Sequence, residues 1–177
     1  EHRGSKGLEL TASPESLRRR EAAIEAARKS SRGGTVDMRE LGRIDHLAIV
    51  PDLEFTNGAI EVVLAGAPAP GSGAGGARGF VGVAFRVQPN GETYDVFYLR
   101  PTNGRADDQE RRNHSAQYIS HPEWTWFRLR EQFPSRYESY VDLQPGEWTK
   151  VRITVEGEKA RLYVHGNEQP TLIVNDL

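Results

Sequence analysis

The residues best suited to chemistry gather in one part of the chain, residues 101–136, which we call the excursion. Here a regular alternation of polar and apolar residues stops, and arginines, acids, amides and histidines are mixed with aromatic side chains. Aromatic rings stack on the C–H faces of sugars, while arginine, amide, acid and imidazole groups hydrogen-bond to hydroxyls. The excursion therefore predicts a site for a carbohydrate or another small polar ligand.

Candidate ligand-binding residues come from the excursion and from the strands expected to flank it. The flanking strands contribute Tyr98, Arg100 and Tyr140, which we expect to form the floor of the site. Two tryptophans two residues apart would share one surface if the chain there is extended. The excursion contributes Asn103, Arg105, Asp107, Asp108, Arg112, Asn113, His114, Gln117, His121, Trp124 and Trp126.

A structural interpretation of the excursion stays open beside the functional one. Loops longer than about 15 residues are uncommon in compact domains and are usually functional or disordered. Aromatic residues such as Tyr118 and Phe133 need something to pack against, so disorder is not expected. Arginine–acid pairs and buried amides can hold a long loop together without any ligand. The two interpretations are compatible, because a binding site needs a rigid loop.

Catalytic patterns lead us to assign no catalytic residue. Glycoside hydrolysis uses two carboxylates about 5–9 Å apart, and Glu138 and Asp142, four residues apart on one face of a strand, are too widely spaced to assign as such a pair. Ser115, His114 and Asp108 are the residue types of a nucleophilic triad, but the sequence around Ser115 is not a nucleophile elbow.

A metal site is also not predicted, and we expect no cofactor. Asp107, Asp108, His114 and His121 have suitable side chains, but the spacing of the histidines matches no helical metal-binding motif. The two adjacent aspartates would point in opposite directions on a strand. Calcium, bound through carboxylates and carbonyls, is the ion we would consider first, because the chain has no cysteine.

Composition and charge exclude several classes of function. The chain has 23 Lys and Arg against 25 Asp and Glu, a formal net charge of −2, which argues against nucleic acid or an anionic membrane as partner. We find no apolar run near the ~18 residues that a membrane span needs. The absence of cysteine excludes disulfides, thiolate catalysis and cysteine zinc sites. The composition suits a secreted or periplasmic protein and a cytoplasmic one equally.

The elements that must position the site are mostly short strands. With 18 glycines and 10 prolines, the composition favours a loop-rich β protein. We therefore predict an all-β fold, an antiparallel sandwich or barrel. Alternation between glycine and proline turns predicts eight strands, at 46–50, 59–64, 79–87, 93–100, 137–143, 148–155, 159–165 and 171–174.

Residues 1–43 are predicted to be a leader and a helix separate from the sandwich, which would span 44–177. Ser13 can cap a helix, Pro14 suits its first position, and Glu15 lies at the positive end of its dipole. Gly33 and Gly34 would end this helix near residue 32. Its apolar residues are mostly alanines, so we expect a peripheral helix or, alternatively, a helix that binds a partner.

The C-terminal part of the chain resembles a known superfamily. Residues 145–176 read PGEWTKVRITVEGEKARLYVHGNEQPTLIVND, in which a tryptophan opens a strand, a hairpin follows, and the next strand ends Leu-Tyr-Val-x-Gly. With GFVGVAFRV at 79–87 and YLRPTNGRADDQERRNHSAQYISHP at 98–122, roughly residues 44–177 resemble bacterial members of the laminin-G-like, concanavalin A-like lectin/glucanase superfamily. Broader relatives of this kind include 3-keto-disaccharide hydrolase domains.

The resemblance implies a two-sheet jelly roll whose concave face or rim binds sugar. It is compatible with sugar binding alone, with a hydrolase acting on 3-keto-glycosides or glucans, and with a non-catalytic interaction domain. In a hydrolase, Asp107, Asp108 and His114 would be the acid/base candidates. Such domains usually continue beyond Leu177 with a glycine-rich strand, so we expect an open sheet edge, or one covered by the helix at 13–32. An oligomer would form through that edge or helix.

Overall fold

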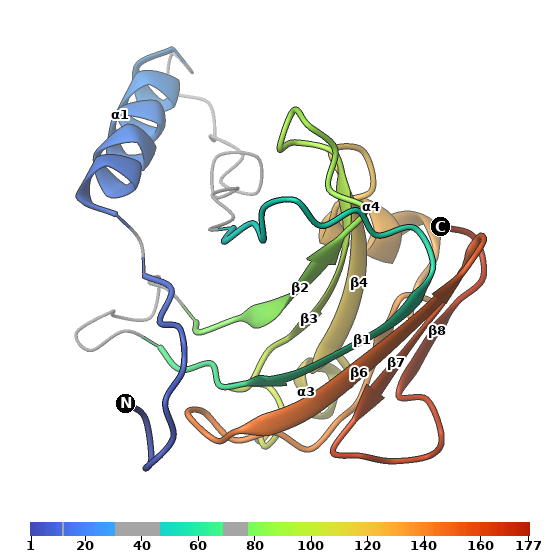
Figure 1. Ribbon diagram of the computed structural model, residues 1–177. Coiled ribbons are helices and arrows are strands. Elements are labelled where there is room, and N and C mark those ends of the chain that lie inside the picture. Colours follow the sequence, from blue (N-terminus) through green and yellow to red (C-terminus); the bar gives the residue numbers. More distant parts are fainter. Residues whose placement is uncertain (12, 31–46, 69–77) are drawn as a thin grey trace. The chain divides into compact units, whose positions relative to one another are not determined.

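The computed structural model describes residues 1–11, 13–30, 47–68 and 78–177. The chain divides into two compact units, Glu1–Asp52 and Leu53–Leu177. The first unit contains helix α1 (Pro14–Ser30), with Glu15 in its first turn, so the predicted helix is confirmed for those residues. The second unit contains every described strand (Figure 1).

The strand predicted at 46–50 is wrong for the part that is described. Residues 47–50 form no strand, and Ile49 and Val50 remain 62% and 65% exposed. Four apolar residues in succession favoured a strand, but no described strand pairs with this segment. Without a ladder or a core to cover it, an apolar run of this length has nothing to stabilise an extended conformation.

Eight strands form two antiparallel four-stranded sheets, which is consistent with the predicted all-β sandwich (Figure 1). One sheet has the order β1 (Gly58–Leu64), β6 (Thr149–Glu156), β7 (Lys159–Val164) and β8 (Leu172–Val174). The other has the order β2 (Val81–Phe85), β3 (Tyr94–Leu99), β4 (Ala116–His121) and β5 (Glu138–Ser139).

The two sheets share one hydrophobic core, built by the alternation that the sequence shows. In β6 the alternate residues Val151, Ile153 and Val155 are buried, as predicted. They belong to the same buried cluster as Phe97 and Leu99 of β3, so side chains of both sheets meet between them. Alternate residues of each strand point the other way, away from this core.

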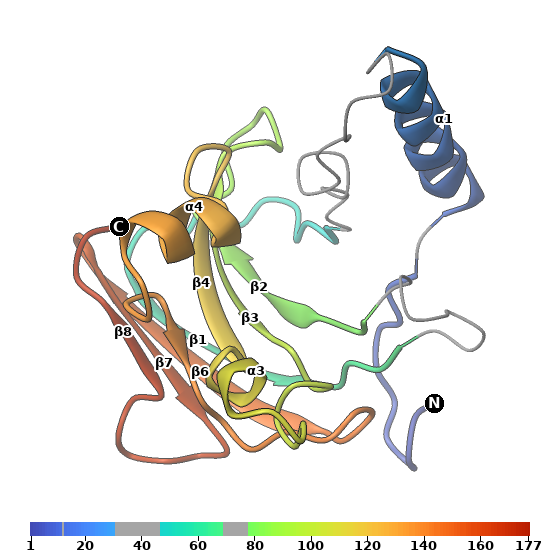
Figure 2. The same ribbon diagram turned by 180° about the vertical axis from the view of Figure 1, so that it is seen from behind.

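The excursion is more regular than its sequence suggests. It contains strand β4, preceded by the short helix α3 (Gln109–Asn113) and followed by α4 (Trp126–Gln132), so the two helices lie at the two ends of β4 (Figure 2). We predicted no strand within residues 101–136, and this prediction is wrong for residues 116–121, which form β4. Because β4 is an interior strand covered on both faces, both of its sets of side chains are buried and no polar–apolar alternation marks it.

The packing of α4 also corrects the expected arrangement of the two tryptophans. Trp126 is the first residue of α4, whereas the backbone of Trp124 bridges to Ser120, so the two rings do not share an extended face. The indole of Trp124 instead packs on Phe133, with ring centroids 6.0 Å apart. Leu129 of α4 is buried in the common core, which fixes the helix against β4.

The strand predicted at 137–143 is wrong for most of its length, because only Glu138–Ser139 form a strand (β5) and residues 140–143 pair with no described strand. We call residues 137–143 the return segment. Gly104 holds the start of the excursion against this segment. A Cβ atom at Gly104 would lie 2.4 Å from the backbone nitrogen of Leu143 and 2.6 Å from its oxygen. Only glycine permits so close an approach of two backbones. The excursion therefore begins and ends side by side, as a compact loop does.

Candidate functional site

The register of the second sheet places three polar residues in one row. Tyr98 of β3 lies opposite Gln117 of β4, and Gln117 lies opposite Glu138 of β5. Their chain neighbours Phe97 and Tyr118 point into the core, so the row points to the opposite side of the sheet. We call this side the outer face.

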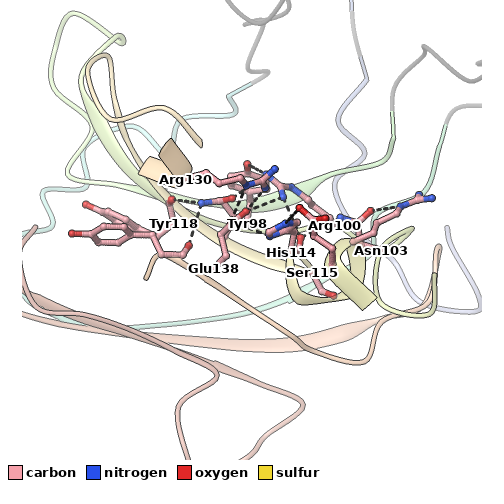
Figure 3. Close-up of polar contacts among 12 residues, drawn as sticks. Tyr98, Arg100, Asn103, His114, Ser115, Tyr118, Arg130 and Glu138 are labelled. Carbon is pink, nitrogen blue, oxygen red and sulfur yellow. Dashed lines mark hydrogen bonds and ion pairs between the residues drawn. The ribbon is translucent and has the colours of Figure 1, made fainter. Parts of the chain in front are cut away.

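Glu138 is the centre of the polar contacts on the outer face (Figure 3). Its side chain is only 2% exposed, and its two oxygens accept hydrogen bonds from two arginines. Arg130 of α4 donates from Nε to Oε2 at 3.0 Å and from Nη2 to Oε1, while Arg100 donates from Nη1 to Oε1 at 3.4 Å. Two guanidinium groups therefore share one buried carboxylate.

Arg100 makes further hydrogen bonds besides the one to Glu138. Its Nη2 donates to the hydroxyl of Tyr98 at 2.7 Å and to Oε1 of Gln117 at 3.0 Å. The fully buried Gln117 amide in turn donates to the carbonyl oxygens of Tyr118 and Tyr137, at 2.9 and 3.1 Å. These hydrogen bonds are directional and mostly buried, so the network fixes the Arg100 guanidinium in one orientation.

Three aromatic rings surround the Arg100 guanidinium. Its central carbon lies 5.3 Å from the ring centroid of Phe80, 5.1 Å from that of Tyr98 and 5.9 Å from that of Trp126. Arg130 lies over the same Trp126 ring at 4.9 Å. Cation–π contacts of this kind stabilise a partly desolvated guanidinium, so the aromatic residues here hold arginines in place as well as offering apolar surface.

His114 lies beside the same carboxylate. Its Nδ1 is 2.9 Å from Oε2 of Glu138, and its Nε2 is 3.9 Å from Oε1 of the exposed Glu110. Burial lowers the pKa of His114, and the charges of Arg130 and Arg100 lower it further, against the opposing effect of Glu138. The imidazole is therefore neutral at pH 7.

The residues that follow β5 continue the pattern with two more arginine contacts. The hydroxyl of Tyr140 accepts a hydrogen bond from Nη2 of Arg112 at 2.9 Å, and the guanidinium also lies over the Tyr140 ring, 5.0 Å from its centroid. Arg105 donates to both oxygens of Asp142, at 2.7 and 2.8 Å, and lowers the pKa of that carboxyl. Outward residues 138, 140 and 142 thus each bind an arginine of the loop.

Seven of the candidate residues meet on the outer face or at its border. These are Tyr98, Arg100, Arg112, His114, Gln117, Trp126 and Tyr140. Arg105 lies further from Glu138, because its partner Asp142 is the next outward residue after Tyr140.

The remaining candidates, apart from the exposed Asp107, have structural contacts. Asp108 caps α3 by accepting a hydrogen bond from the backbone of Arg111 at 2.8 Å, and Asp107 is exposed before it. Asn103 accepts from Nε of Arg111 and donates to the carbonyl of His114. Further from the carboxylate, Asn113 pairs with Gln109, His121 packs on Tyr94, and Trp124 packs on Phe133.

Sequence reasoning missed three residues of this site, namely Glu138, Arg130 and Phe80. Glu138 and Tyr140 are alternate residues of the strand predicted at 137–143, so choosing Tyr140 as part of the floor already pointed to Glu138 on the same face. Phe80 likewise shares a face with Gly82, whose side is exposed. For Arg130 no local signal existed, because its partner comes from a different element.

The described residues hold no group of three or more histidine, cysteine or acidic side chains placed to bind a metal ion. None of the helices in the described part is long and apolar enough to cross a membrane. What the outer face offers is a set of fixed hydrogen-bond donors beside half-exposed rings, which suits recognition of a ligand rich in acceptors.

Comparisons with known proteins add no further guide to this site: no family model, curated protein or solved structure matches the chain. The resemblance to the lectin/glucanase superfamily stays a prediction. What the chain does must therefore be argued from the contacts on its outer face.

Proposed function

We propose that this chain binds a carbohydrate on the outer face of the β2–β5 sheet. The observation that supports this most is a pair of exposed aromatic rings at the two borders of the arginine network. Phe80, just before β2, is 44% exposed, and Tyr140, just after β5, is 41% exposed. Most large aromatic side chains of a folded domain are buried, so two open rings flanking fixed polar groups suggest a contact surface.

The spacing of the two rings suits a ligand larger than one sugar ring. β2 and β5 are the outer strands of the sheet, so three strand spacings of about 4.8 Å separate them, or ~14 Å in all. Between them lie Arg100, Trp126 and His114. Ring faces at both ends and rigid donors in the middle are the combination expected for an oligosaccharide.

Rigidity is the second argument for binding. Arg130, whose side chain is 32% exposed, is already held by Glu138, so a ligand that contacts it would not have to order its side chain. Immobilising a flexible side chain costs about 0.5–1.5 kcal/mol on binding. A surface whose donors are held in advance avoids that cost and keeps more of the free energy of each hydrogen bond.

A glycan array followed by calorimetric titration of the full chain tests the proposal. We expect at least one oligosaccharide to bind, and we expect Phe80→Ala and Tyr140→Ala each to weaken that binding about tenfold or more, in line with the loss of a stacked ring. If the folded chain binds no glycan, the proposal is wrong, and the excursion is better understood as the structural clasp of an interaction domain.

Tyr163 provides a matched control for Tyr140. It lies on the outward side of the other sheet, opposite Arg152 in β6, and that guanidinium lies 3.8 Å from its ring centroid. Tyr163→Ala therefore removes a tyrosine with the same kind of arginine contact but from the wrong sheet. Glycan affinity should be unchanged in this variant.

A glycan-processing hydrolase, of the 3-keto-glycoside or glucan type, is the second candidate. The observation that favours it is the neutral imidazole of His114 beside the carboxylate of Glu138. A neutral histidine next to an acid can act as a general base. If the chain turns over a bound glycan, His114→Gln should abolish turnover while binding persists. Turnover that survives in His114→Gln would exclude this role.

A further inference from the structure

Guanidinium groups outnumber carboxylates on the outer face. Arg100 and Arg130 share the single carboxylate of Glu138, while Arg112 is bound to a neutral phenol, that of Tyr140. Three positive charges are therefore directly opposed by one negative charge. The side chain of Arg130 is 32% exposed, and Arg112 is half-buried, so both charges remain accessible to a ligand.

Several buried polar atoms of this face have no hydrogen-bond partner among the described residues, including both nitrogens of His114. The Nε atoms of Arg100 and Arg112 are buried and have no hydrogen-bond partner among the described residues. The side chain of Arg100 is itself only 7% exposed. Both oxygens of Glu138 already accept hydrogen bonds, and the Tyr140 hydroxyl accepts one from Arg112. A buried donor without an acceptor is costly, so a negative charge placed close to these guanidinium groups would be favourable.

The other charged groups around the face do not cancel this surplus. Asp142 is occupied by Arg105 through both oxygens, and Asp108 is occupied as the cap of α3. His114 carries no charge at pH 7, because burial lowers its pKa. Glu110 is the acid nearest to His114 after Glu138, and its side chain is 87% exposed, so solvent screens it strongly.

The two accessible arginines are anchored at neighbouring outward positions. Arg130 is bound to residue 138 and Arg112 to residue 140, and alternate residues of a strand lie about 7 Å apart. A guanidinium binds a planar or tetrahedral anion through parallel N–H groups, which a neutral hydroxyl cannot match. Because their anchoring residues are neighbouring outward positions, the two guanidinium groups border the same part of the outer face.

We infer that the sugar recognised by this chain is acidic, with a carboxylate or sulfate group placed against Arg112 and Arg130. This inference rests on the proposed function, since it names the class of carbohydrate bound at that same face. The anionic group places a negative charge close to these guanidinium groups, and the flanking rings of Phe80 and Tyr140 contact the neighbouring sugar units.

Titrations of the full chain with matched sugars test the inference. The probes are oligogalacturonate, the same oligomer with its carboxyl groups reduced to alcohols, and a sulfated galactan oligomer. We expect an acidic probe to bind at least tenfold more tightly than the reduced one, and its affinity to fall as salt rises. Equal or tighter binding of the reduced oligomer would overturn the inference but leave the proposed function standing. Binding of no probe, acidic or neutral, would count against both.

Arginine variants locate the effect. Arg112→Gln should lower affinity for the acidic probe about tenfold more than it lowers affinity for the reduced probe, whose binding it can affect only through its contact with Tyr140. Arg112→Lys should recover part of the loss by restoring the charge. Arg128→Gln is the matched control, because Arg128 is an exposed arginine of α4 that donates to the carbonyl of Glu123 instead. If Arg128→Gln and Arg112→Gln weaken binding equally, the effect is one of overall charge and the assignment to this site is wrong.

Discussion

Glu138 is the side chain that two arginines of the outer face, Arg100 and Arg130, share. In Glu138→Gln the two guanidiniums of Arg100 and Arg130 would lose their shared negative charge while remaining largely buried. Breaking a buried ion pair by removing one partner typically costs about 3–5 kcal/mol, and the partial exposure of Arg130 favours the lower end. We therefore expect the free energy of unfolding to fall by about 3 kcal/mol, measured by chemical denaturation.

The control for this prediction is Glu131→Gln, which removes the same charge from an exposed position of α4. It should change stability by less than about 0.5 kcal/mol, as surface substitutions usually do. A similar small change in Glu138→Gln would show that the buried carboxylate is not needed to hold the arginines.

His114 should make the stability of the chain depend on pH. Burial lowers the pKa of His114 in the folded state. At pH values between the folded-state and unfolded-state pKa of this histidine, the unfolded chain therefore binds more protons than the folded chain. The free energy of unfolding should thus decrease as the pH falls below about 6.5, the ordinary pKa of histidine, and the loss should be complete below the pKa of the folded state.

Denaturation curves of the native chain and of His114→Gln between pH 8 and 5 measure this effect. At pH 8 the two differ only in packing, since histidine is neutral there in both states. Below pH 6.5 the native chain should lose stability faster than His114→Gln. Parallel curves over the whole range would contradict the lowered pKa.

At the same scale, the sequence identified the residue types of the site better than their pairings. Tyr98, Arg100 and Tyr140 were predicted because they end or resume an alternating pattern, and they do border the network. Glu138 pairs with Arg100, 38 residues away, and with Arg130, 8 residues away, on three different elements. Such pairings depend on sheet register and helix position, which local composition does not encode.

Among the elements, the cap of α3 shows how a structural residue can be mistaken for a ligand-binding one. Asp108 was a candidate for ligand binding, yet its Oδ1 accepts the backbone N–H of Arg111 as the helix cap. Asp108→Ala should lower the free energy of unfolding by about 1 kcal/mol, while Asp108→Asn, which can also cap, should cost much less. Unfolding curves give the stabilities, and glycan affinity should be unchanged in Asp108→Asn. Loss of affinity in the folded Asp108→Asn would instead assign the carboxylate to the ligand.

The contact between Gly104 and Leu143 fixes the start of the excursion to the return segment after β5. In Gly104→Ala the new methyl group would overlap the Leu143 backbone, so the two segments would have to separate. Overpacking of this kind costs about 1–3 kcal/mol, and we expect a loss in that range by chemical denaturation. Gly91→Ala is an informative control because its Cβ would meet no atom within 4 Å, although its φ of +66° adds strain. An equal loss in both variants would mean that backbone strain, rather than the close approach, sets the cost.

The elements most easily predicted were those with one face in the core and one outside. Strands β3, β6 and β7 alternate clearly and were found nearly at their observed bounds. β4 was missed because neighbours on both faces bury its polar residues, including Gln117, along with its apolar ones. The opposite error at 47–50 has the same physical origin, since an apolar run becomes a strand only where a partner strand exists.

At the scale of the whole molecule, each sheet has two edge strands, and each of these pairs with one strand among the described residues. β1 and β8 end the first sheet, and β2 and β5 end the second. Val63 of β1 and Ile173 of β8 are 50% and 45% exposed, which gives these borders some apolar surface. The expected association through an open edge or through the N-terminal helix stays a prediction, and sedimentation of the full chain over a range of concentrations tests it.

The distribution of the core leads to a prediction for the whole chain. Every buried hydrophobic residue of the described chain lies between Phe85 and Val174, within the unit Leu53–Leu177. Since the core carries most of the free energy of folding, a fragment of residues 53–177 should unfold in one cooperative transition and keep its glycan binding. Thermal unfolding followed by circular dichroism, together with the calorimetric titration, measures both properties. A fragment that folds but no longer binds glycan would show that residues 1–52 contribute to recognition, whereas a fragment with no cooperative transition would show that they are needed for the fold itself.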